Sequence, residues 1–359
     1  MDVPPLTRHL MPYRRTDAPW GLARISHTNP VSGDIKSLNY TYTYGDEFLG
    51  AGVDIYVVDT GVNLDHVCNK LLRSITSLER LTIGNCYSFR LTLVVARFSA
   101  GPAPVWRRPM TTVTVRTSPV LPQAPATASL SGRTLSPSRF STRLGEHNCK
   151  LSPCVVPSLR PPRSIGTLAN VIGGLNYVRE AAADSGRPSI ASSSLGGGAS
   201  KSIDDAATAL TDAGVHVVVA AGNANVDAAN TSPARCPSVI TVGAVDMVDS
   251  KASFSNYGSV VNIWAPGVSI TSAGYRGTSS TLVQSGTSQA TPHVSGLAAL
   301  YLCEHGNVPP ATLAENLWSQ ADRITGLRSG SNNRLAVGPV LIWTGEHRFS
   351  RVYPKGVAF

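Results

Sequence analysis

Apolar residues alternate between two periods along much of the chain and predict a succession of helices and strands. A helical period begins at Ser164 and ends near Gly186, and short continuous runs of Val, Ile and Ala follow it. The other predicted elements are strands at 53–58, 190–195, 215–221, 239–245 and 260–264, and helices at 202–213, from Ser288 onward, and at 311–321. Nearly continuous apolar strands that alternate with helices indicate an α/β fold, with a mostly parallel sheet covered on both faces.

Three stretches depart from this pattern. Residues 16–45 are predicted to form polar loops with short ordered pieces. Residues 67–100 keep some apolar runs, but 101–163 are a mixture of Pro, Arg, Ser and Thr without a helical or strand period. Such composition predicts low order. Residues 338–359 have no clear place in the predicted sheet and are left as an unassigned tail.

The positive charge is confined to one of these stretches. The chain has 359 residues, 42% of them hydrophobic, which suffices for one large domain, and its net charge is +9. Residues 67–163 hold 14 Lys and Arg against two acidic residues, a net +12, so the remainder carries −3. Because this segment lacks interleaved aromatic residues and any recognised module, we exclude a nucleic-acid partner. Four of the six cysteines also lie there, so cysteine usage says little about the redox compartment.

Targeting signals are not apparent. No apolar run is long enough to span a membrane, so no membrane partner is expected. The opening residues, MDVPPLTRHLMPYRR, lack the apolar core of a secretory signal peptide. We interpret residues 1–15 as the remnant of a pro-segment.

Three polar residues stand at the ends of predicted elements. Asp59 follows the strand 53–58, Asn223 follows the strand 215–221, and Ser288 opens a helix. The carboxyl ends of parallel strands lie at one edge of a sheet. Acyl transfer needs an orienting carboxylate, an oxyanion donor and a nucleophile, with a base between the first and the last.

Two of these residues, Ser288 and Asp59, also have a simpler interpretation. Ser is a frequent helix N-cap, and Asp59 is compatible with a loop cap. The string Asp59-Thr60-Gly61 also occurs in aspartic proteases, but Val62 follows it and the chain contains no second copy. We therefore rank the aspartic protease low.

Longer strings around these residues are similar to a known family. They are APWGLARIS (18–26), VDIYVVDTGV (53–62), SSLGGG (193–198), VVVAAGNANVDAANTSPA (217–234), SVITVGAVD (238–246), SFSNYGSVVNIWAPG (253–267), SGTSQATPHVSGLAAL (285–300) and NNRLAV (332–337). The chain resembles the subtilases, and the proteinase K-like branch in particular. The resemblance covers residues 16–66 and 164–337. It implies a three-layer subtilisin-like catalytic domain over 16–337, interrupted by an anomalous basic insertion at 67–163.

The resemblance also implies roles for individual residues. Ser288 would be the nucleophile, Asp59 the triad aspartate and Asn223 the oxyanion donor. Peptide substrate would pair with Ser194, Leu195 and Gly196, while Ala220, Ala221 and Gly222 would line a pocket with room for large apolar side chains. Catalysis would require no cofactor, and a structural calcium ion would use the carbonyls of Pro237 and Val239. Asn262 stands where the family has a carboxylate, and Gln289 stands where it usually has Met after the nucleophile.

The catalytic histidine has no counterpart in the sequence as written. In the family it lies in a D-G-H-G-T-H-V-A-G string, which this chain lacks. His66 matches a non-catalytic position, His147 has no matching context, and His293 within the Ser288 helix is expected to be a packed structural residue. We therefore assign none of them as the base.

A shifted reading frame offers an explanation. When each codon of MTTVTVRTSP (110–119) is regrouped with the next, the permitted residues include D-D-G-H-G-T-H-V-A-G in order. We therefore expect a frame error over roughly residues 91–148, and an intron retained near 67–90 would account for the preceding stretch. The competing account is a subtilase that has lost its histidine.

The resemblance thus implies a secreted, monomeric serine endopeptidase that acts on proteins or peptides, but the sequence contains no identifiable catalytic histidine. The alternative is a non-catalytic peptide-binding relative or a non-functional gene product.

Overall fold

The structure is a computed structural model that describes residues 13–44, 50, 52–59, 90–95, 112–114, 167–274, 277–345 and 348–352. Strands β4 (Arg90–Val95), β5 (Thr112–Thr114), β14 (Val340–Gly345) and β15 (Arg348–Val352) are described by their backbone alone. Most of the predicted insertion 67–163 and the segment 1–12 lie outside the described residues. The domain boundaries therefore stay predictions.

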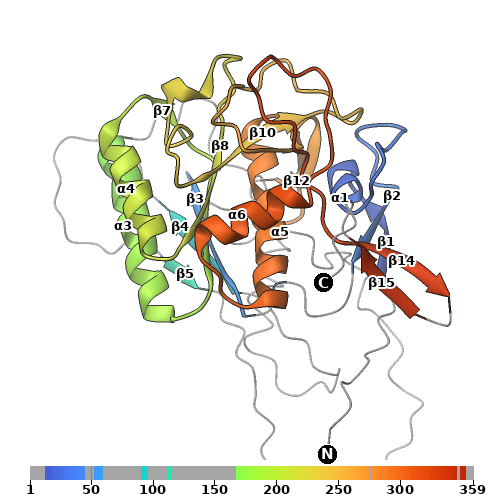
Figure 1. The fold of residues 1–359 in the computed structure, drawn as a ribbon, viewed down its shortest axis with the longest axis horizontal. Helices are drawn as coiled ribbons and strands as arrows, with labels where there is room; N and C mark the ends of the chain where they lie inside the picture. The colour runs from blue at the N-terminus through green and yellow to red at the C-terminus, as the bar shows by residue number, and fades with distance from the viewer. Residues whose placement is uncertain are drawn as a thin grey trace, which may run out of the picture.

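A seven-stranded sheet forms the middle of the molecule, in the order β11-β10-β8-β6-β3-β4-β5 (Figure 1). Neighbouring strands are parallel except β4 and β5, which are antiparallel. This confirms the predicted parallel sheet. Its other strands are β3 (Asp54–Asp59), β6 (Ser189–Ser193), β8 (His216–Ala220), β10 (Ile240–Val245) and β11 (Ile263–Pro266).

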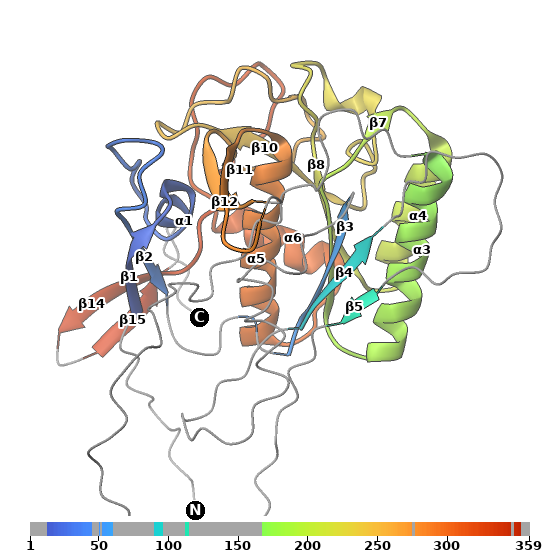
Figure 2. The ribbon, with the colours of Figure 1, turned by 180° about the vertical axis from the view of Figure 1, so that it is seen from behind.

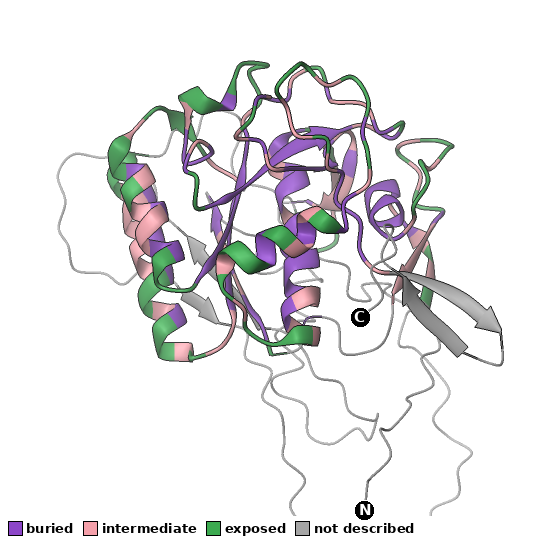
Figure 3. Ribbon diagram, in the orientation of Figure 1, coloured by how far each residue is buried: buried purple, intermediate pink, exposed green. Residues whose placement is uncertain are grey.

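Helices cover the sheet on both faces, as predicted (Figures 1 and 2). One face packs against α3 (Leu168–Ser185) and α4 (Lys201–Asp212), and the other against α1 (Trp20–Ile25), α5 (Thr287–His305) and α6 (Pro310–Ser319). Helix α5 is buried along most of its length, whereas α3 and α4 each have a buried and an exposed side (Figure 3). No helix among the described residues is long and apolar enough to cross a membrane.

Alternation along β3 divides the core in two. Tyr56 and Val58 pack with α3 and α4, while Ile55 packs in the cluster that contains α5. Because side chains of a strand point alternately to opposite faces, Asp59 lies on the same face as Ile55. The sheet therefore directs Asp59 toward the α5 layer.

Helix α1 is more buried than the predicted polar loops at 16–45 imply. All six of its residues are buried, including Arg24, which is 0% exposed. The Arg24 guanidinium donates to both carboxylate oxygens of Asp249 at 2.8 and 2.9 Å and to Asp322 at 3.1 Å. A buried charge needs such partners, and they come from distant parts of the chain. The sequence indicated a short ordered piece here but not its burial, because these partners are far away in the sequence.

The start of β11 also differs from its prediction. Residues 260–262 were predicted as strand, but the strand begins at Ile263. Val261 is fully buried in an apolar cluster with Trp264 and Leu335, and its N–H donates to Gly258 O in a turn. A buried turn and a buried strand have the same apolar composition, so the pattern did not separate them.

Four two-stranded antiparallel sheets accompany the central sheet in the described part of the chain. They are β1 (Tyr13–Ala18) with β2 (Tyr40–Tyr44), β7 (Gly197–Gly198) with β9 (Thr231–Ser232), β12 (Ile270–Ala273) with β13 (Thr281–Gln284), and β14 with β15. The last of them accounts for much of the unassigned tail. Gly338 N donates to Ile25 O at 2.7 Å and thereby joins the start of this tail to α1.

Candidate active site

The N-terminus of α5 meets the chain just beyond β6. The Ser288 hydroxyl donates to Ser194 O at 3.2 Å, and the Ser194 hydroxyl donates to Ser288 O at 3.0 Å. The helix begins at Thr287 with Gly286 as N-cap, and no side chain caps it. The N-cap interpretation of Ser288 is therefore wrong. Its hydroxyl lies within the first turn, where free N–H groups and the helix dipole favour negative charge.

Asn223 is bound to the same helix end. Its Oδ1 accepts hydrogen bonds from Thr287 N at 2.8 Å and from the Thr287 hydroxyl at 3.0 Å. A backbone N–H only donates, so the oxygen of the Asn223 amide must face Thr287. The NH₂ group is thus left as a donor, and a Cβ on Gly286 would lie 3.5 Å from its nitrogen. The structure places a hydrogen-bond donor beside the helix turn that carries Ser288.

Asp59 lies at the carboxyl end of β3, where it is 6% exposed. In the parallel pairing of β3 with β6, Val58 is opposite Ser193. Asp59 is therefore beside Ser194, which contacts Ser288. The structure brings the predicted Asp59 and Ser288 to one edge of the sheet, on the α5 face.

The predicted substrate segment, Ser194 to Gly196, connects β6 with β7 and takes no part in the described sheet ladders. A Cβ on Gly196 would lie 3.1 Å from Ser232 O and 3.6 Å from the Thr231 methyl group. A side chain at Gly196 would be in tight contact with the Ser232 carbonyl, and Leu195 is half-buried beside it. The segment presents backbone that an extended peptide can pair with.

The predicted pocket residues follow β8. Ala220 and Ala221 are buried, and Gly222 has φ +104°, a left-handed conformation that favours glycine. A Cβ on Gly222 would lie 2.4 Å from Asn256 Nδ2 and 3.7 Å from the Thr231 methyl group. The Thr231 methyl group is therefore close to both Gly196 and Gly222, and sequence reasoning assigned it no role at the site.

Two histidines of the described chain are buried away from this site. His293 Nδ1 bonds to Gln289 O at 2.8 Å, and Nε2 packs against Gly21 of α1. Burial lowers the pKa of His293 to about 4, against a smaller opposing effect of that hydrogen bond. Burial also lowers the pKa of His216, whose Nε2 lies 3.3 Å from Asn307 Oδ1. The prediction that His293 is a packed structural residue is confirmed.

The remaining histidines offer no base in the described part of the chain. His27 Nδ1 lies 2.7 Å from Ala23 O, and His305 Nδ1 lies 3.0 Å from Tyr301 O. Neither these nor the two buried histidines bond to Ser288. The others, at 9, 66, 147 and 347, lie outside the described residues.

Asn262, which stands where the family has a carboxylate, is hydrogen-bonded within the strand layer. Its Oδ1 accepts the Thr241 N–H at 2.7 Å, so this oxygen already has a partner within the strand layer. Among the described residues no group of three or more His, Cys, Asp or Glu is arranged to hold a metal. The calcium site at Pro237 and Val239 therefore stays a prediction, carried by two carbonyls.

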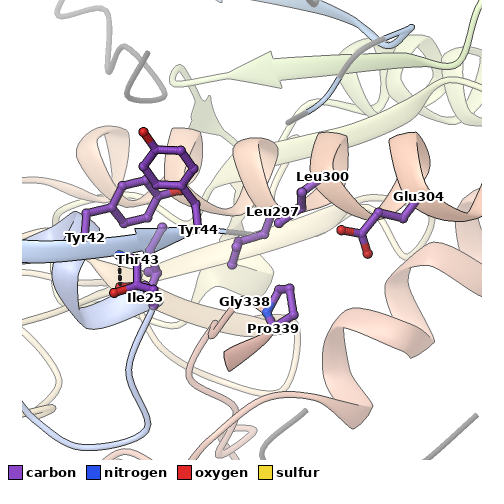
Figure 4. A pocket seen from close by; sticks show the side chains of 10 residues that line it. Ile25, Tyr42, Thr43, Tyr44, Leu297, Leu300, Glu304, Gly338 and Pro339 are labelled. Atoms are coloured by element: carbon purple, nitrogen blue, oxygen red, sulfur yellow. Dashed lines mark hydrogen bonds between the residues drawn. The ribbon is translucent and has the colours of Figure 1, made fainter. Parts of the chain in front are cut away.

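A small cavity lies at the other end of α5 (Figure 4). Its volume of about 20 Å³ has room for a single water molecule. It is lined by Ile25, Ser26, Tyr42, Thr43, Tyr44, Leu297, Leu300, Glu304, Gly338 and Pro339. This cavity is too small for a peptide and lies roughly 18 Å along the helix from Ser288.

Comparison with known proteins agrees with this geometry. The model of the subtilase family matches residues 162–338. A cuticle-degrading serine protease from Arthrobotrys oligospora is 34% identical over 90% of this chain and 68% of its own length. An extracellular serine proteinase from a Thermus species is 37% identical over 84% of this chain and 61% of its own length. The crystal structure of a cold-adapted subtilisin-like serine proteinase matches with a TM-score of 0.57 at 30% identity, over 90% of this chain and 98% of that one. The chain therefore belongs to the subtilase family of serine peptidases.

Proposed function

We propose that the chain is a serine endopeptidase in which Ser288 attacks the scissile carbonyl. The observation that carries this proposal is the convergence of Ser288, Asn223 and the segment 194–196 at the first turn of α5. Attack forms a bond between Oγ and the carbonyl carbon and moves negative charge to the carbonyl oxygen. The Asn223 amide and the N–H groups of the helix turn then stabilise that oxyanion.

The hydroxyl proton must pass to a base as the bond forms. Asp59 is positioned to orient such a base from the α5 face of the sheet. The base itself has to come from outside the described residues, and the string permitted by the shifted frame at 110–119 would supply a histidine there. Without a base Ser288 stays a weak nucleophile at neutral pH.

The substrate in this proposal is an extended polypeptide. It would lie along Ser194 to Gly196 as an added strand, with the side chain before the cut against Ala220, Ala221 and Gly222. Because these pocket residues are small, we expect a preference for large apolar side chains at that position. The Thr231 methyl group is close to Gly222 at the same pocket.

Peptide binding without hydrolysis is the second candidate. It is favoured by the described histidines, which bond elsewhere. The two candidates share the substrate segment and differ only in the activation of Ser288.

Labelling with a fluorophosphonate probe separates the candidates. The full chain as written is compared with a chain whose frame is regrouped over 91–148, and Ser288→Ala is made in each as the control. We expect rapid labelling at Ser288 in the regrouped chain and almost none in the chain as written. Regrouped protein that folds but leaves Ser288 unlabelled would overturn the endopeptidase proposal.

Sequencing the transcript across codons 60–170 tests the frame itself. A continuous frame that matches residues 91–148 as written, without a nearby splice junction or insertion, would favour the lost histidine. A restored G-H-G-T-H string would favour an active peptidase.

The remaining proposals concern the setting of the enzyme. The name of the Thermus relative supports an extracellular location. We further propose a monomer that needs no cofactor for catalysis, with calcium at Pro237 and Val239 as a structural ion. Sedimentation and thermal unfolding with calcium or a chelator test these points.

A further inference from the structure

Asn256 occupies an unusual position in the loop between β10 and β11. It is 2% exposed and lies beneath the loop that carries Asn223. Neither the sequence strings nor the reaction assigned it a role. Its contacts are with the backbone on both sides of the oxyanion donor.

The side-chain amide of Asn256 is fully used. Its Oδ1 accepts the N–H groups of Ala224 at 3.0 Å and Val226 at 3.1 Å. Its Nδ2 donates to Ala221 O at 2.8 Å and to the Thr231 hydroxyl at 3.3 Å. Backbone N–H groups only donate and carbonyls only accept, so this orientation of the amide is required by its partners.

The backbone of Asn256 adds a further contact, because its N–H donates to Gly222 O at 2.9 Å. Gly222 has no Cβ, and one built there would lie 2.4 Å from Asn256 Nδ2. The glycine thus lets the buried amide reach the loop. One residue holds the chain immediately before and immediately after Asn223.

We propose that Asn256 is a positioning residue that holds the Asn223 amide in place to receive the oxyanion. Its bond to the Thr231 hydroxyl couples that amide to a side chain that is close to both Gly196 and Gly222. The catalytic meaning of this inference rests on the proposed endopeptidase function. The positioning itself does not, because the placement of Asn223 can be measured independently, through the hydrogen bond that its Oδ1 accepts from the Thr287 N–H.

The hydrogen exchange rate of the Thr287 amide measures the placement of Asn223. Thr287 begins α5, where N–H groups have no partner within the helix, and its N–H donates to Asn223 Oδ1 at 2.8 Å. No hydrogen bond joins Asn256 to Thr287. Gly222 N also donates to the Thr287 hydroxyl at 3.1 Å, but the Thr287 N–H itself is held by Asn223 Oδ1, so exchange of this amide follows the placement of Asn223.

The experiment measures hydrogen exchange of single amides by NMR in the full chain at neutral pH. We expect Asn256→Ala to accelerate exchange about tenfold or more at Ala224, Val226 and Thr287. Asn256→Asp keeps the acceptor for Ala224 and Val226 but loses the donor to Ala221. In Asn256→Asp the amides of Ala224 and Val226 should therefore stay protected, while the Thr287 amide still exchanges faster than in the parent chain. This variant also replaces Asn256→Ala as the test if the alanine variant does not fold.

Asn332→Asp is the matched control. Asn332 Nδ2 also donates to two backbone carbonyls, Ser259 O and Val261 O, both at 2.9 Å. It does not contact the Asn223 loop. The control should leave the Thr287 amide at the wild-type rate, and Asn223→Ala should accelerate Thr287 alone.

Two outcomes would overturn the proposal. One is an unchanged Thr287 amide in both Asn256 variants, and the other is equal acceleration of Thr287 in Asn332→Asp, which would indicate general destabilisation. Fluorophosphonate labelling of the same samples tests the endopeptidase separately. In a chain that is labelled, the Asn256 variants should lower kcat by a larger factor than they raise KM.

Discussion

The two ends of α5 share one helix and have opposite chemistry. At its N-terminus three separate stretches of chain come together, and they carry Ser194, Asn223 and Ser288. Toward its C-terminus, Leu297 and Leu302 pack in the apolar core, beside a cavity that has room for one water molecule. The difference arises because the carboxyl ends of the parallel strands lie around the first turn only. We therefore expect function and stability to depend on different ends of this buried helix.

Ser288→Ala gives the largest expected effect. Removing the hydroxyl should abolish fluorophosphonate labelling in a chain that carries a base. Hydrolysis through a covalent intermediate should also be lost, since no other group supplies the nucleophile. The free energy of unfolding should change little, because the hydroxyl bonds to a single carbonyl. Loss of structure by circular dichroism would contradict the separation of function from stability.

Asn223→Ala should come next in effect on the rate. In subtilisin, a member of the family, loss of an oxyanion donor asparagine lowers kcat about 100- to 1000-fold, and we expect a similar factor here. KM should stay nearly constant, because the donor acts on charge that develops in the transition state. An equal loss in binding of an uncleaved peptide would contradict this role.

Leu302→Ala tests the other end of the helix. Leu302 is 2% exposed in the core, so its truncation should lower the free energy of unfolding by about 2–5 kcal/mol. The rate of Ser288 labelling should remain that of the parent chain under native conditions. Urea denaturation measures the first quantity, and a matching fall in labelling rate would show that the two ends are not independent.

His293 lies between the two ends and predicts a pH effect. Its pKa is lowered to about 4 by burial, below the ordinary 6.5, so the unfolded chain binds the proton first. Stability should be complete above pH 6.5 and fall as the pH drops toward 4, by about 3 kcal/mol in total. His293→Gln should remove this component, whereas His305→Gln on the exposed last turn should keep it. Unfolding curves at several pH values measure this dependence. A free energy of unfolding that falls with pH as steeply in His293→Gln as in the parent chain would contradict the prediction.

Local patterns predicted four of the five described α-helices and five of the seven strands of the central sheet. The helix that ends near Gly186, the strand before Asn223 and the helix that carries Ser288 all formed where the apolar period placed them. Continuous apolar runs indicated a parallel sheet because strands buried on both faces lack alternation. The errors came where burial has no local pattern, as at Arg24 and at the turn around Val261.

The candidate site likewise contains residues that the sequence indicated and residues that it did not. The sequence indicated Asp59, Asn223 and Ser288 because they stand at the ends of predicted elements and lie in extended strings, and their catalytic roles stay predictions. Asn256 and Thr231 were missed, although both lie inside those strings, because their roles depend on contacts with Gly222 and its neighbours.

The sequence by itself determined the α/β architecture, the subtilase resemblance and the three polar residues at element ends. These depend on periodicity and short-range order, which the chain carries locally. Only the tertiary structure decided that Ser288 bonds to Ser194 instead of capping its helix, and that Asn256 lies beneath the loop that carries Asn223. Such contacts join residues that are far apart in the chain, and they form only when the sheet has brought its carboxyl ends together.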